Sequence, residues 1–466
     1  MKQYPVGIFI FRRDLRVDYN TSFSKCLELC DKVIPVFIFN PVQVGEQNKF
    51  RSSPSIQFMI ESLDDLRENL ESKNGGLYTF KGENNKIVEH IIKKYKPNAL
   101  FVNKDYTPYS KKRDASIEKI CKKEGVDFHS YHDVCLFKPG TILTDGGETY
   151  QKFTPFYNKC ISSISSIERN NKTRFHKSWF KNGVESSFFI SLKDAYITLA
   201  QISEKIVVAG GRDKGLAIIN SIKDFNNYEK CRNLLTYNTT HLSAYLKYGC
   251  VSVVEVFNKL MSISGKTNSL IRQLIWRDFY IHILDAFPRV LQGKSLKPKY
   301  DAIKWENNTT WFNHWKRGTT GFPIVDACMR QLNESGYMHN RGRMIVASFL
   351  IKNLRTDWRW GEKYFAQNLV DYDPAANNGN WQWVSGSGAD SQPYFRIFNP
   401  WTQSEKFDKD CVYIKKWCPE LESVPNEHIH QWEKYYKDHP EIKYPSPIID
   451  YKESRKKAID MYKKYL

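Results

Sequence analysis

The first 135 residues alternate short apolar runs with segments in which apolar residues recur every three or four positions. Residues 55–72 and 84–95 have the periodicity of amphipathic helices. The apolar runs are typical of buried strands and lie at residues 6–11, 32–39, 77–80, 99–102 and 127–131. Strands joined by helices pair in parallel and are covered on both faces, so this alternation strongly constrains the fold. We expect an α/β domain with a doubly wound parallel sheet at residues 1–135.

The glycine-rich signature of an ordinary dinucleotide site is missing from this Rossmann-like half of the chain. A G-x-G-x-x-G loop should follow the first strand, but residues 9–15 read FIFRRDL. We expect Arg12, Arg13 and Asp14 to anchor the loop after the first strand, with a ligand role as the alternative. Residues 210–222 contain glycines but lack the G-K-S/T ending of a P-loop, so they predict only the start of a helix.

Helical periodicity dominates the second half of the chain. The clearest helical segments are residues 252–263, 269–284, 322–335 and 341–354. Residues 136–205 are polar, have weak periodicity and are typical of an interdomain linker. We therefore expect a larger all-α domain at residues 206–466.

Charge and cysteine content narrow the class of protein. The chain has 70 Lys and Arg against 51 Asp and Glu, and the net charge of +19 favours a polyanionic partner such as nucleic acid. Its 12 tryptophans and 14% aromatic content suit a surface on which bases stack. Ten cysteines occur without a C-x-x-C pair, so we expect free thiols and no metal site.

Membrane and secretion signals are not predicted. No apolar run reaches the roughly 18 residues that span a bilayer, and the first apolar run is too short for a secretory signal. We expect a soluble intracellular protein, in the cytoplasm or the nucleus, with no membrane partner.

Polar and aromatic residues share one face of the helix expected at 269–284. Gln273, Trp276, Arg277 and Tyr280 are spaced by three and four positions, which places them together. An amide, an indole, a guanidinium and a phenol are poor core material, and they suit a wet cavity that binds a flat polar ring. An interhelical hydrogen-bond cluster is the alternative interpretation of this face.

A charged pair and a phosphate-binding turn are predicted in the same helical half. An arginine buried among helices needs a carboxylate partner, and we expect Arg343 to pair with Asp371. Residues 239–243 carry hydroxyls and backbone amides at an expected helix start, where phosphate groups bind readily. Together these groups offer phosphate donors, amides for a ring and an ion pair.

Ordered motifs cover nearly the whole chain. They read RRDLR at 12–16, TTHLSAYLKYGCVS at 239–252, LIWRDFY at 274–280, GFPIVDACMRQL at 321–332, YMHNRGRM at 337–344, DPAANNGNWQW at 373–383 and PYFRIFNPWTQSEKFD at 393–408. This set resembles the photolyase/cryptochrome family. The last three motifs most resemble class I cyclobutane pyrimidine dimer DNA photolyases.

The resemblance implies an FAD bound in a U-shape within the helical domain, with the reduced form FADH⁻ as the active state. It also implies that Asn377 faces the flavin N5, where light-sensing members of the family often carry a different residue. The implied cofactor-binding residues are Tyr228, Thr239, Thr240, His241, Leu242, Ser243, Gln273, Arg277, Asn340, Arg343, Asp371, Tyr372, Asp373 and Asn377.

The same resemblance implies light-driven repair of UV-damaged DNA, a carbon–carbon lyase reaction. Excited FADH⁻ would donate an electron to a flipped-out pyrimidine dimer, the cyclobutane ring would split, and the electron would return. Trp276 and Trp383 would form the walls around the lesion, and the protein would act as a monomer. The implied DNA-binding residues are Arg232, Gln273, Trp276, Tyr280, Asn340, Arg341, Trp383, Arg396 and Gln403.

A tryptophan relay to the resting flavin is also implied by the resemblance. Trp381 would lie nearest the flavin, with Trp358 and then Trp315 following toward solvent. Indole is among the easiest side chains to oxidise, so three in near contact can pass an electron inward.

One residue departs from the class I pattern. Those enzymes usually carry Glu where this chain has Gln273, and an amide there donates a hydrogen bond but supplies no proton. A Gln is similar to six-four photolyases and animal cryptochromes, but these usually carry a His-His pair where this chain has His339 and Asn340. Dimer repair is the leading prediction; the alternatives are a six-four photolyase and a cryptochrome blue-light photoreceptor without repair activity.

A second, antenna chromophore would bind near residues 103–114. Tyr109 and Ser110 stand where folate-binding relatives tend to carry Asn-Glu, which disfavours methenyltetrahydrofolate. A deazaflavin, a second flavin, a folate or no antenna stay open.

Overall fold

The computed structural model describes residues 2–167, 173, 179–180 and 186–465, so part of the predicted linker lies outside the described residues. The chain divides into two compact units that each collect several segments. The first unit comprises Met1–Ile202, Val208–Lys223 and Leu242–Pro288, and the second comprises Ser203–Val207, Asp224–His241 and Arg289–Leu466. The domain boundaries expected near residues 135 and 205 stay a prediction.

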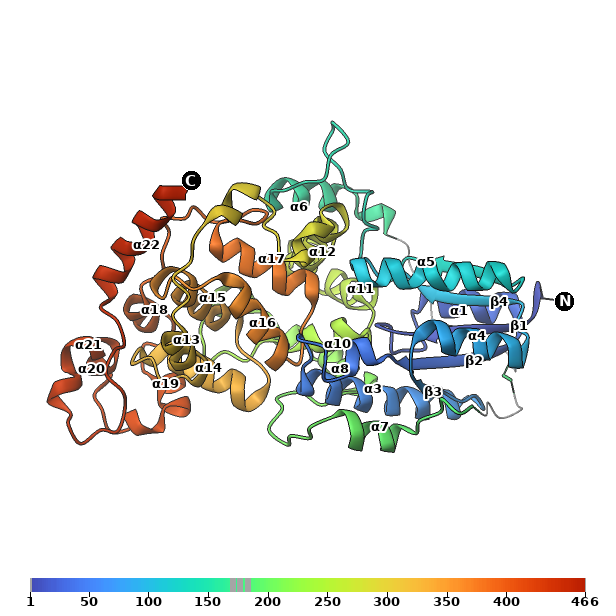
Figure 1. Cartoon of the computed structure of the whole chain (residues 1–466), viewed down its shortest axis with the longest axis horizontal. Helices are drawn as coiled ribbons and strands as arrows, with labels where there is room; N and C mark the ends of the chain where they lie inside the picture. The colour runs from blue at the N-terminus through green and yellow to red at the C-terminus, as the bar shows by residue number, and fades with distance from the viewer. Residues whose placement is uncertain (1, 168–172, 174–178, 181–185, 466) are drawn as a thin grey trace. The chain divides into compact units, whose positions relative to one another are not determined.

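A five-stranded parallel sheet forms the centre of the first unit (Figure 1). Its order is β3-β2-β1-β4-β5, and residue Ile8 pairs with Ile34 on one side and with Leu100 on the other. The strands are β1 (Tyr4–Phe11), β2 (Cys30–Phe39), β3 (Tyr78–Lys81), β4 (Ala99–Asn103) and β5 (Asp127–Tyr131). The predicted doubly wound sheet is therefore confirmed.

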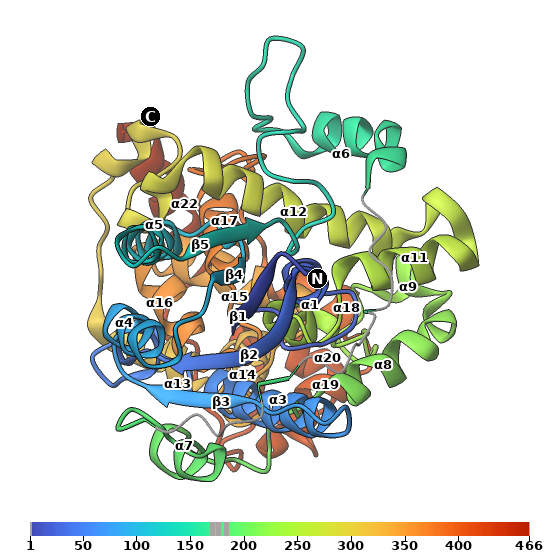
Figure 2. The ribbon, with the colours of Figure 1, turned by 90° about the vertical axis from the view of Figure 1, so that its right-hand side faces the viewer.

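Alternating side chains of β1 explain why both faces of the sheet are covered. Ile8 and Ile10 pack into an apolar cluster with α4 (Asn84–Tyr95) and α5 (Pro108–Lys123). Phe9 and Phe11 point to the opposite face, where Phe23 of α1 (Thr21–Leu29) lies 5.0 and 5.2 Å from their ring centres. Figure 2 shows the strands one above another, from β5 to β3, with α4 and α5 on one side and α1 on the other.

The remaining helices of the first unit include the one that carries the predicted polar face, α12. They are α2 (Pro41–Val44), α3 (Ser53–Glu71), α6 (Phe153–Ser162), η1 (Ile164–Ser166), α7 (Leu192–Leu199), α8 (Arg212–Asn220), η2 (Ile222–Phe225, which continues into the second unit), α10 (Leu242–Tyr248), α11 (Val253–Ser264), η3 (Gly265–Thr267) and α12 (Ser269–Ala286). Helix α12 packs against α6 and α11. The helix start predicted within 210–222 is confirmed by α8.

All the regular elements among the described residues of the second unit are helices. Its elements are α9 (Tyr228–Cys231), η4 (Pro288–Gln292, which begins at the last residue of the first unit), η5 (Pro298–Ala302), α13 (Thr309–Arg317), α14 (Pro323–Ser335), α15 (Asn340–Ser348), the π-helical η6 (Phe349–Asn353), α16 (Trp358–Asn368), α17 (Pro374–Ser385), α18 (Pro400–Phe407), α19 (Val412–Trp417), η7 (Pro419–Leu421), α20 (Asn426–His430), α21 (Trp432–Tyr435), η8 (Tyr436–Asp438) and α22 (Tyr451–Tyr465). The helix predicted at 341–354 is thus an α-helix followed by a π-helical segment.

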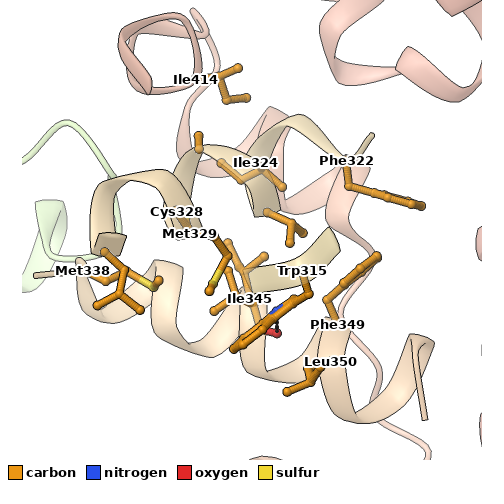
Figure 3. Packing of buried hydrophobic residues seen from close by; sticks show 14 of the residues in the cluster. Trp315, Phe322, Ile324, Cys328, Met329, Met338, Ile345, Phe349, Leu350 and Ile414 are labelled. Carbon is orange, nitrogen blue, oxygen red and sulfur yellow. Dashed lines mark hydrogen bonds between the residues drawn. The ribbon is translucent and has the colours of Figure 1, made fainter. Parts of the chain in front are cut away.

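One large apolar core holds these helices together. Figure 3 shows Trp315 of α13 packed among Cys328, Met329, Ile345 and Leu350. The Trp315 indole N–H donates to the Val346 carbonyl at 3.0 Å, so its one polar atom is satisfied inside the core.

Within the described part of the chain, the helices are all too short or too polar to cross a bilayer.

Candidate functional site

The polar face predicted on α12 is present in the first unit. Trp276 is partly exposed, and its indole stacks on the ring of Phe153 from α6, with ring centres 3.6 Å apart and planes 5° from parallel. Tyr280 lies one turn further along the helix, is buried, and has its ring centre 5.7 Å from that of Trp276. One face of the Trp276 indole is thus covered by Phe153, and the residue stays partly exposed.

Two neighbours on this face differ in how their polar groups are used. Gln273 is partly exposed, and its amide has no hydrogen bond to any of the described residues. The Arg277 guanidinium donates to the backbone carbonyls of Val134 at 2.5 Å and Leu246 at 3.3 Å. These contacts tie α12 to the segment after β5 and to α10, so they give Arg277 a structural role that the sequence did not indicate.

The predicted ion pair between Arg343 and Asp371 is confirmed in the second unit. The guanidinium donates to both carboxylate oxygens of Asp371 at 2.9 and 3.1 Å and to the Met338 carbonyl at 2.8 Å. Burial alone would lower the pKa of Arg343, but the Asp371 carboxylate raises it above its ordinary value overall. The Arg343 guanidinium therefore stays charged.

Two histidines lie beside this pair with unpaired ring nitrogens: His339 is buried, and His241 is partly exposed. His241 has a left-handed backbone, with φ of 53°, and its ring lies 4.6 Å from that of Tyr337. His339 accepts the Arg341 N–H at Nδ1, which places its proton on Nε2. His241 Nδ1 and His339 Nε2 are buried without a partner among the described residues. Burial, and then the charges of Arg343 and Arg341, lower the pKa of His339 to about 4.

His339 is a candidate functional residue that the sequence analysis did not assign to the site. It belongs to the YMHNRGRM motif, and that motif was the available signal. A buried N–H donor without a partner is costly unless a ligand accepts its hydrogen bond.

The start of α17 positions Asn377. Asp373 caps this helix by accepting the N–H groups of Ala375 and Ala376 at 2.9 and 3.0 Å. One turn later, the Asn377 side-chain N–H₂ donates to the Glu362 carbonyl at 3.0 Å, which leaves the amide oxygen as the acceptor. Asn377 is 9% exposed.

Behind Asn377 lies a buried network of amides and one carboxyl. Asn378 donates to Glu362 Oε1 at 2.9 Å, and Gln382 donates to Asn378 Oδ1 at 2.9 Å. Burial raises the pKa of Glu362 to about 7. This network fixes α17 against α16, and with it the position of the Asn377 amide.

The structure brings two of the three predicted relay tryptophans into contact. The ring centres of Trp381 and Trp315 lie 6.3 Å apart. Trp381 also packs directly on Gly361 of α16, one turn after Trp358, and a Cβ at Gly361 would come within 2.2 Å of the indole. Only glycine permits this approach, so Gly361 is part of the support for Trp381.

The burial of Trp315 differs from the place expected for it in the relay. That residue was predicted to lie nearest solvent, but it is 0% exposed and sits in the centre of the apolar core. The polar neighbours in NHWKRG made it look like a surface residue, although a helical period turns one side chain in three or four inward.

Trp305 is a partly exposed tryptophan to which the sequence analysis assigned no role. The residue after it, Glu306, donates its N–H to the Arg355 carbonyl at 3.0 Å, and the Asp357 N–H donates to Asn307 Oδ1 at 2.9 Å. These bonds hold the segment of Trp305 beside the residues that immediately precede Trp358. The residues around Trp305 form no motif that would indicate a role for it from a single sequence.

Three arginines predicted to bind DNA phosphates are neighbours in the second unit. Burial, and then the charges of Arg232 and Arg396, lower the pKa of Arg341. Arg341 donates to Asn233 at 2.7 Å, and the carboxylate nearest Arg232 is Glu229 at 3.6 Å. The positive charges therefore outnumber the negative ones here, as an anion-binding surface requires.

The other predicted residues lie near these groups along the chain. Trp383 is partly exposed on α17, and Gln403 on α18 has a buried amide oxygen without a partner among the described residues. Tyr228 begins α9, and burial raises its pKa to about 12. Thr239 shares a hydrogen bond of 3.2 Å with the Tyr337 hydroxyl. Of the remaining predicted residues, Thr240 lies before α10, and Leu242 and Ser243 lie on α10. Asn340 begins α15, and Tyr372 lies before α17.

Known proteins match both halves of the chain. Residues 8–173 match the family described as DNA photolyase, and residues 270–464 match the FAD-binding domain of DNA photolyase. The deoxyribodipyrimidine photo-lyase of Buchnera aphidicola subsp. Acyrthosiphon pisum is 38% identical over 475 residues, which cover 97% of this chain and 96% of that protein.

The chain belongs to the photolyase/cryptochrome family.

Solved structures extend the match to three dimensions. An archaeal photolyase from Sulfolobus tokodaii with two FAD molecules has a TM-score of 0.86 and 39% identity, covering 98% of this chain and 100% of its own. A bacterial class III photolyase from Agrobacterium tumefaciens has a TM-score of 0.89 and 32% identity, covering 100% of this chain and 98% of its own. The photolyase fold, an α/β domain with a helical FAD-binding domain, thus accounts for both units.

The residues present in this photolyase fit an FAD. His241 Nδ1 and His339 Nε2 are buried without a partner among the described residues, and the Asn377 amide oxygen accepts no hydrogen bond from those residues. All three atoms belong to the same unit as the Arg343–Asp371 pair. Unpaired donors and acceptors of this kind are what a polar ring and a phosphate-bearing chain require. The Gln273 amide, which has no hydrogen bond among the described residues, and the partly exposed Trp276 indole add a second surface, on α12.

Charged residues also gather at the carboxyl end of β1 in this photolyase. Arg12 and Arg113 share one carboxylate, Asp114, at 2.8 and 2.9 Å. One guanidinium nitrogen of each arginine is buried without a partner among the described residues. Burial, and then Arg113, lower the pKa of Arg12. Tyr109 lies in the same region, 5.8 Å from the Arg113 guanidinium.

Proposed function

We propose that this chain repairs cyclobutane pyrimidine dimers in DNA, in a light-driven reaction of the deoxyribodipyrimidine photo-lyase type. Full-length similarity to relatives with that name carries the proposal. The buried Asn377 amide, whose oxygen accepts no hydrogen bond from the described residues, supports it at the level of the site. FAD, when bound and reduced, supplies the electron that light transfers to the lesion.

The second unit would hold the FAD with polar and charged side chains from several of its segments. The Arg343–Asp371 pair keeps a fixed charge of each sign beside the site, and Thr239 and His241 offer donors for phosphate or ribityl oxygens. The Asn377 amide oxygen would accept the hydrogen bond of a protonated flavin N5. Because an amide carries no charge, it does so without repelling an anionic ring.

The lesion would be held between two tryptophans. Trp276 would stack on one pyrimidine, with Trp383 as the second wall, because indole supplies a large flat contact surface. The free Gln273 amide would donate a hydrogen bond to a carbonyl of the dimer. Arg232, Arg341 and Arg396 would hold the phosphates that flank the flipped-out nucleotides.

We propose that electrons reach resting FAD through Trp381 and Trp358, and that Trp305 is the station nearest solvent. Trp305 is partly exposed and its segment is hydrogen-bonded beside Trp358, whereas Trp315 is fully buried. Trp315 would then be a side contact of Trp381 rather than an exit.

The experiment that tests the function uses two substrates. Reduced protein is illuminated with oligonucleotides that carry either a cyclobutane dimer or a six-four photoproduct, and restored bases are quantified. Restoration of the dimer alone is the expected result. Restoration of the six-four product alone would favour the rival that Gln273 resembles, and restoration of neither would favour a light receptor.

We further propose that a second chromophore binds at the carboxyl end of the sheet. Strands β2 and β4 lie on opposite sides of β1, and this switch point is where open α/β sheets bind ligands. The two spare guanidinium donors of Arg12 and Arg113 suit a phosphate-bearing flavin. Denaturing the purified protein and identifying every released chromophore tests this, and release of one FAD alone would contradict it.

A further inference from the structure

Arg272 stands apart from its neighbours because its charge is not neutralised. Within the part of the chain that the structure describes, its guanidinium has neither a carboxylate partner nor a hydrogen bond. It is partly exposed on α12, directly before Gln273. Arg277 on the same helix instead donates to two backbone carbonyls.

Two aromatic rings of α6 hold the Arg272 side chain. Its guanidinium carbon lies 4.7 Å from the centre of the Tyr157 ring and 5.1 Å from that of Phe153. A guanidinium over a ring is attracted by the ring's negative face. Its N–H groups lie in its own plane, so a stacked arginine keeps donors free at its edge.

The same helix α6 also supports Trp276. Arg272 and Trp276 are four residues apart on α12, which puts them on one face, and both contact Phe153. Phe153 is 1% exposed, so its ring is a fixed support rather than a mobile side chain. A free positive charge is therefore held at a set position close to Trp276.

We infer that Arg272 binds a backbone phosphate of the DNA strand next to the lesion, and that Phe153 and Tyr157 position it. This inference rests on the proposed function. The free charge would attract the phosphate, and the two rings would orient the guanidinium. Trp276, which is proposed to stack on the lesion, lies close by, so the phosphate would be one next to the lesion. Tyr157 and Phe153 thereby become positioning residues for DNA binding.

Salt dependence tests the phosphate contact. The affinities of the protein for an undamaged duplex and for the same duplex with one dimer are measured over a range of KCl concentrations. Arg272→Gln is expected to make the slope of log affinity against log salt less steep by about 0.9 for both duplexes, because one counterion fewer is released. Their affinity ratio should stay the same, because a phosphate contact carries no base information.

Arg67→Gln is the matched control. It removes the same charge from α3, where Arg67 pairs with Asp64 at 2.9 Å and Glu71 at 2.8 Å, and the slope should not change. An unchanged slope in Arg272→Gln, with normal FAD content and normal circular dichroism, would overturn the inference.

A second variant tests the role of the rings. Tyr157→Leu leaves the charge in place but removes one support, so affinity should fall for both duplexes while the salt slope stays that of the parent. Unchanged affinity would contradict positioning by the rings. If the parent binds DNA with the expected slopes but repairs no lesion under light, the proposed function fails while the Arg272 contact stands.

Discussion

Asn377 shows how one hydrogen bond can determine what a side chain offers to a ligand. Its N–H₂ group donates a hydrogen bond to the Glu362 carbonyl at 3.0 Å. This bond fixes the direction of the amide, whose oxygen remains as the acceptor for a ligand. The sequence predicted an amide near the flavin but left its direction open. Direction depends on Glu362, which lies on another helix.

Trp381→Phe separates photoreduction from repair. Phenylalanine fills much of the space against Gly361 but is far harder to oxidise, so illumination of the oxidised protein should no longer reduce FAD. The chemically reduced variant should still repair dimers. Absorption spectra under blue light and a repair assay measure the two properties.

Trp417→Phe is a suitable control, because Trp417 is a partly buried tryptophan that packs against the same core. It should keep both properties. Loss of repair in chemically reduced Trp381→Phe would show that Trp381 does not act as a relay.

Gln273→Glu tests the departure from the class I pattern. The Gln273 amide has no protein partner among the described residues, so a carboxyl at this position would meet the lesion and not the protein. A protonated carboxyl can supply a proton as charge develops on the dimer, and we expect a higher quantum yield of dimer repair. A yield equal to or below that of the parent would refute this reading of Gln273.

At the scale of the element, α12 combines an exposed working face with a buried anchor. Asp278 is 0% exposed and accepts the N–H groups of Leu136 at 2.7 Å and Phe137 at 3.1 Å. This carboxyl fixes α12 to the segment after β5, and it therefore helps to place Trp276 and Gln273.

Asp278→Asn should alter how stability depends on pH. Burial raises the pKa of Asp278 from 3.8 to about 7, so the folded protein binds this proton more tightly than the unfolded chain. The resulting stabilisation is fully present below about pH 4 and is lost as pH rises through 7, at most on the order of 4 kcal/mol. The variant cannot titrate here, so its stability relative to the parent should rise between pH 4 and pH 7.

Urea unfolding at several pH values measures this difference. Asp64→Asn, at an exposed carboxyl on α3, is the control and should follow the parent. A constant difference between Asp278→Asn and the parent across this range would contradict the assigned pKa.

Elements were more predictable than their contacts. The α12 face of Gln273, Trp276 and Tyr280 follows from helical spacing alone, and the structure contains it. The stack of Phe153 on Trp276 joins residues more than a hundred positions apart, so no local pattern indicates it. The burial of Trp315 is a similar case, because neighbouring polar residues say little about which way one side chain points within a packed core.

At the scale of the whole molecule, the sequence predicted the kind of elements better than their division into units. Strand–helix alternation predicted the sheet, and periodicity predicted most of the clear helices. The division into two units that each draw on several segments did not follow from composition, because residues 242–288 are helical yet join the unit of the sheet. Long-range packing decided that assignment.

In the proposed reaction the electron donated to the dimer returns to the flavin. One reduced protein should therefore repair many lesions without a further reductant. Anaerobic, fully reduced protein is mixed with a large excess of dimer-containing oligonucleotide, the reductant is removed, and repaired dimers per protein are counted under light. Many repaired dimers per protein are expected, with the flavin spectrum unchanged at the end. One dimer or fewer per protein, with a flavin that is oxidised in step, would contradict this return of the electron.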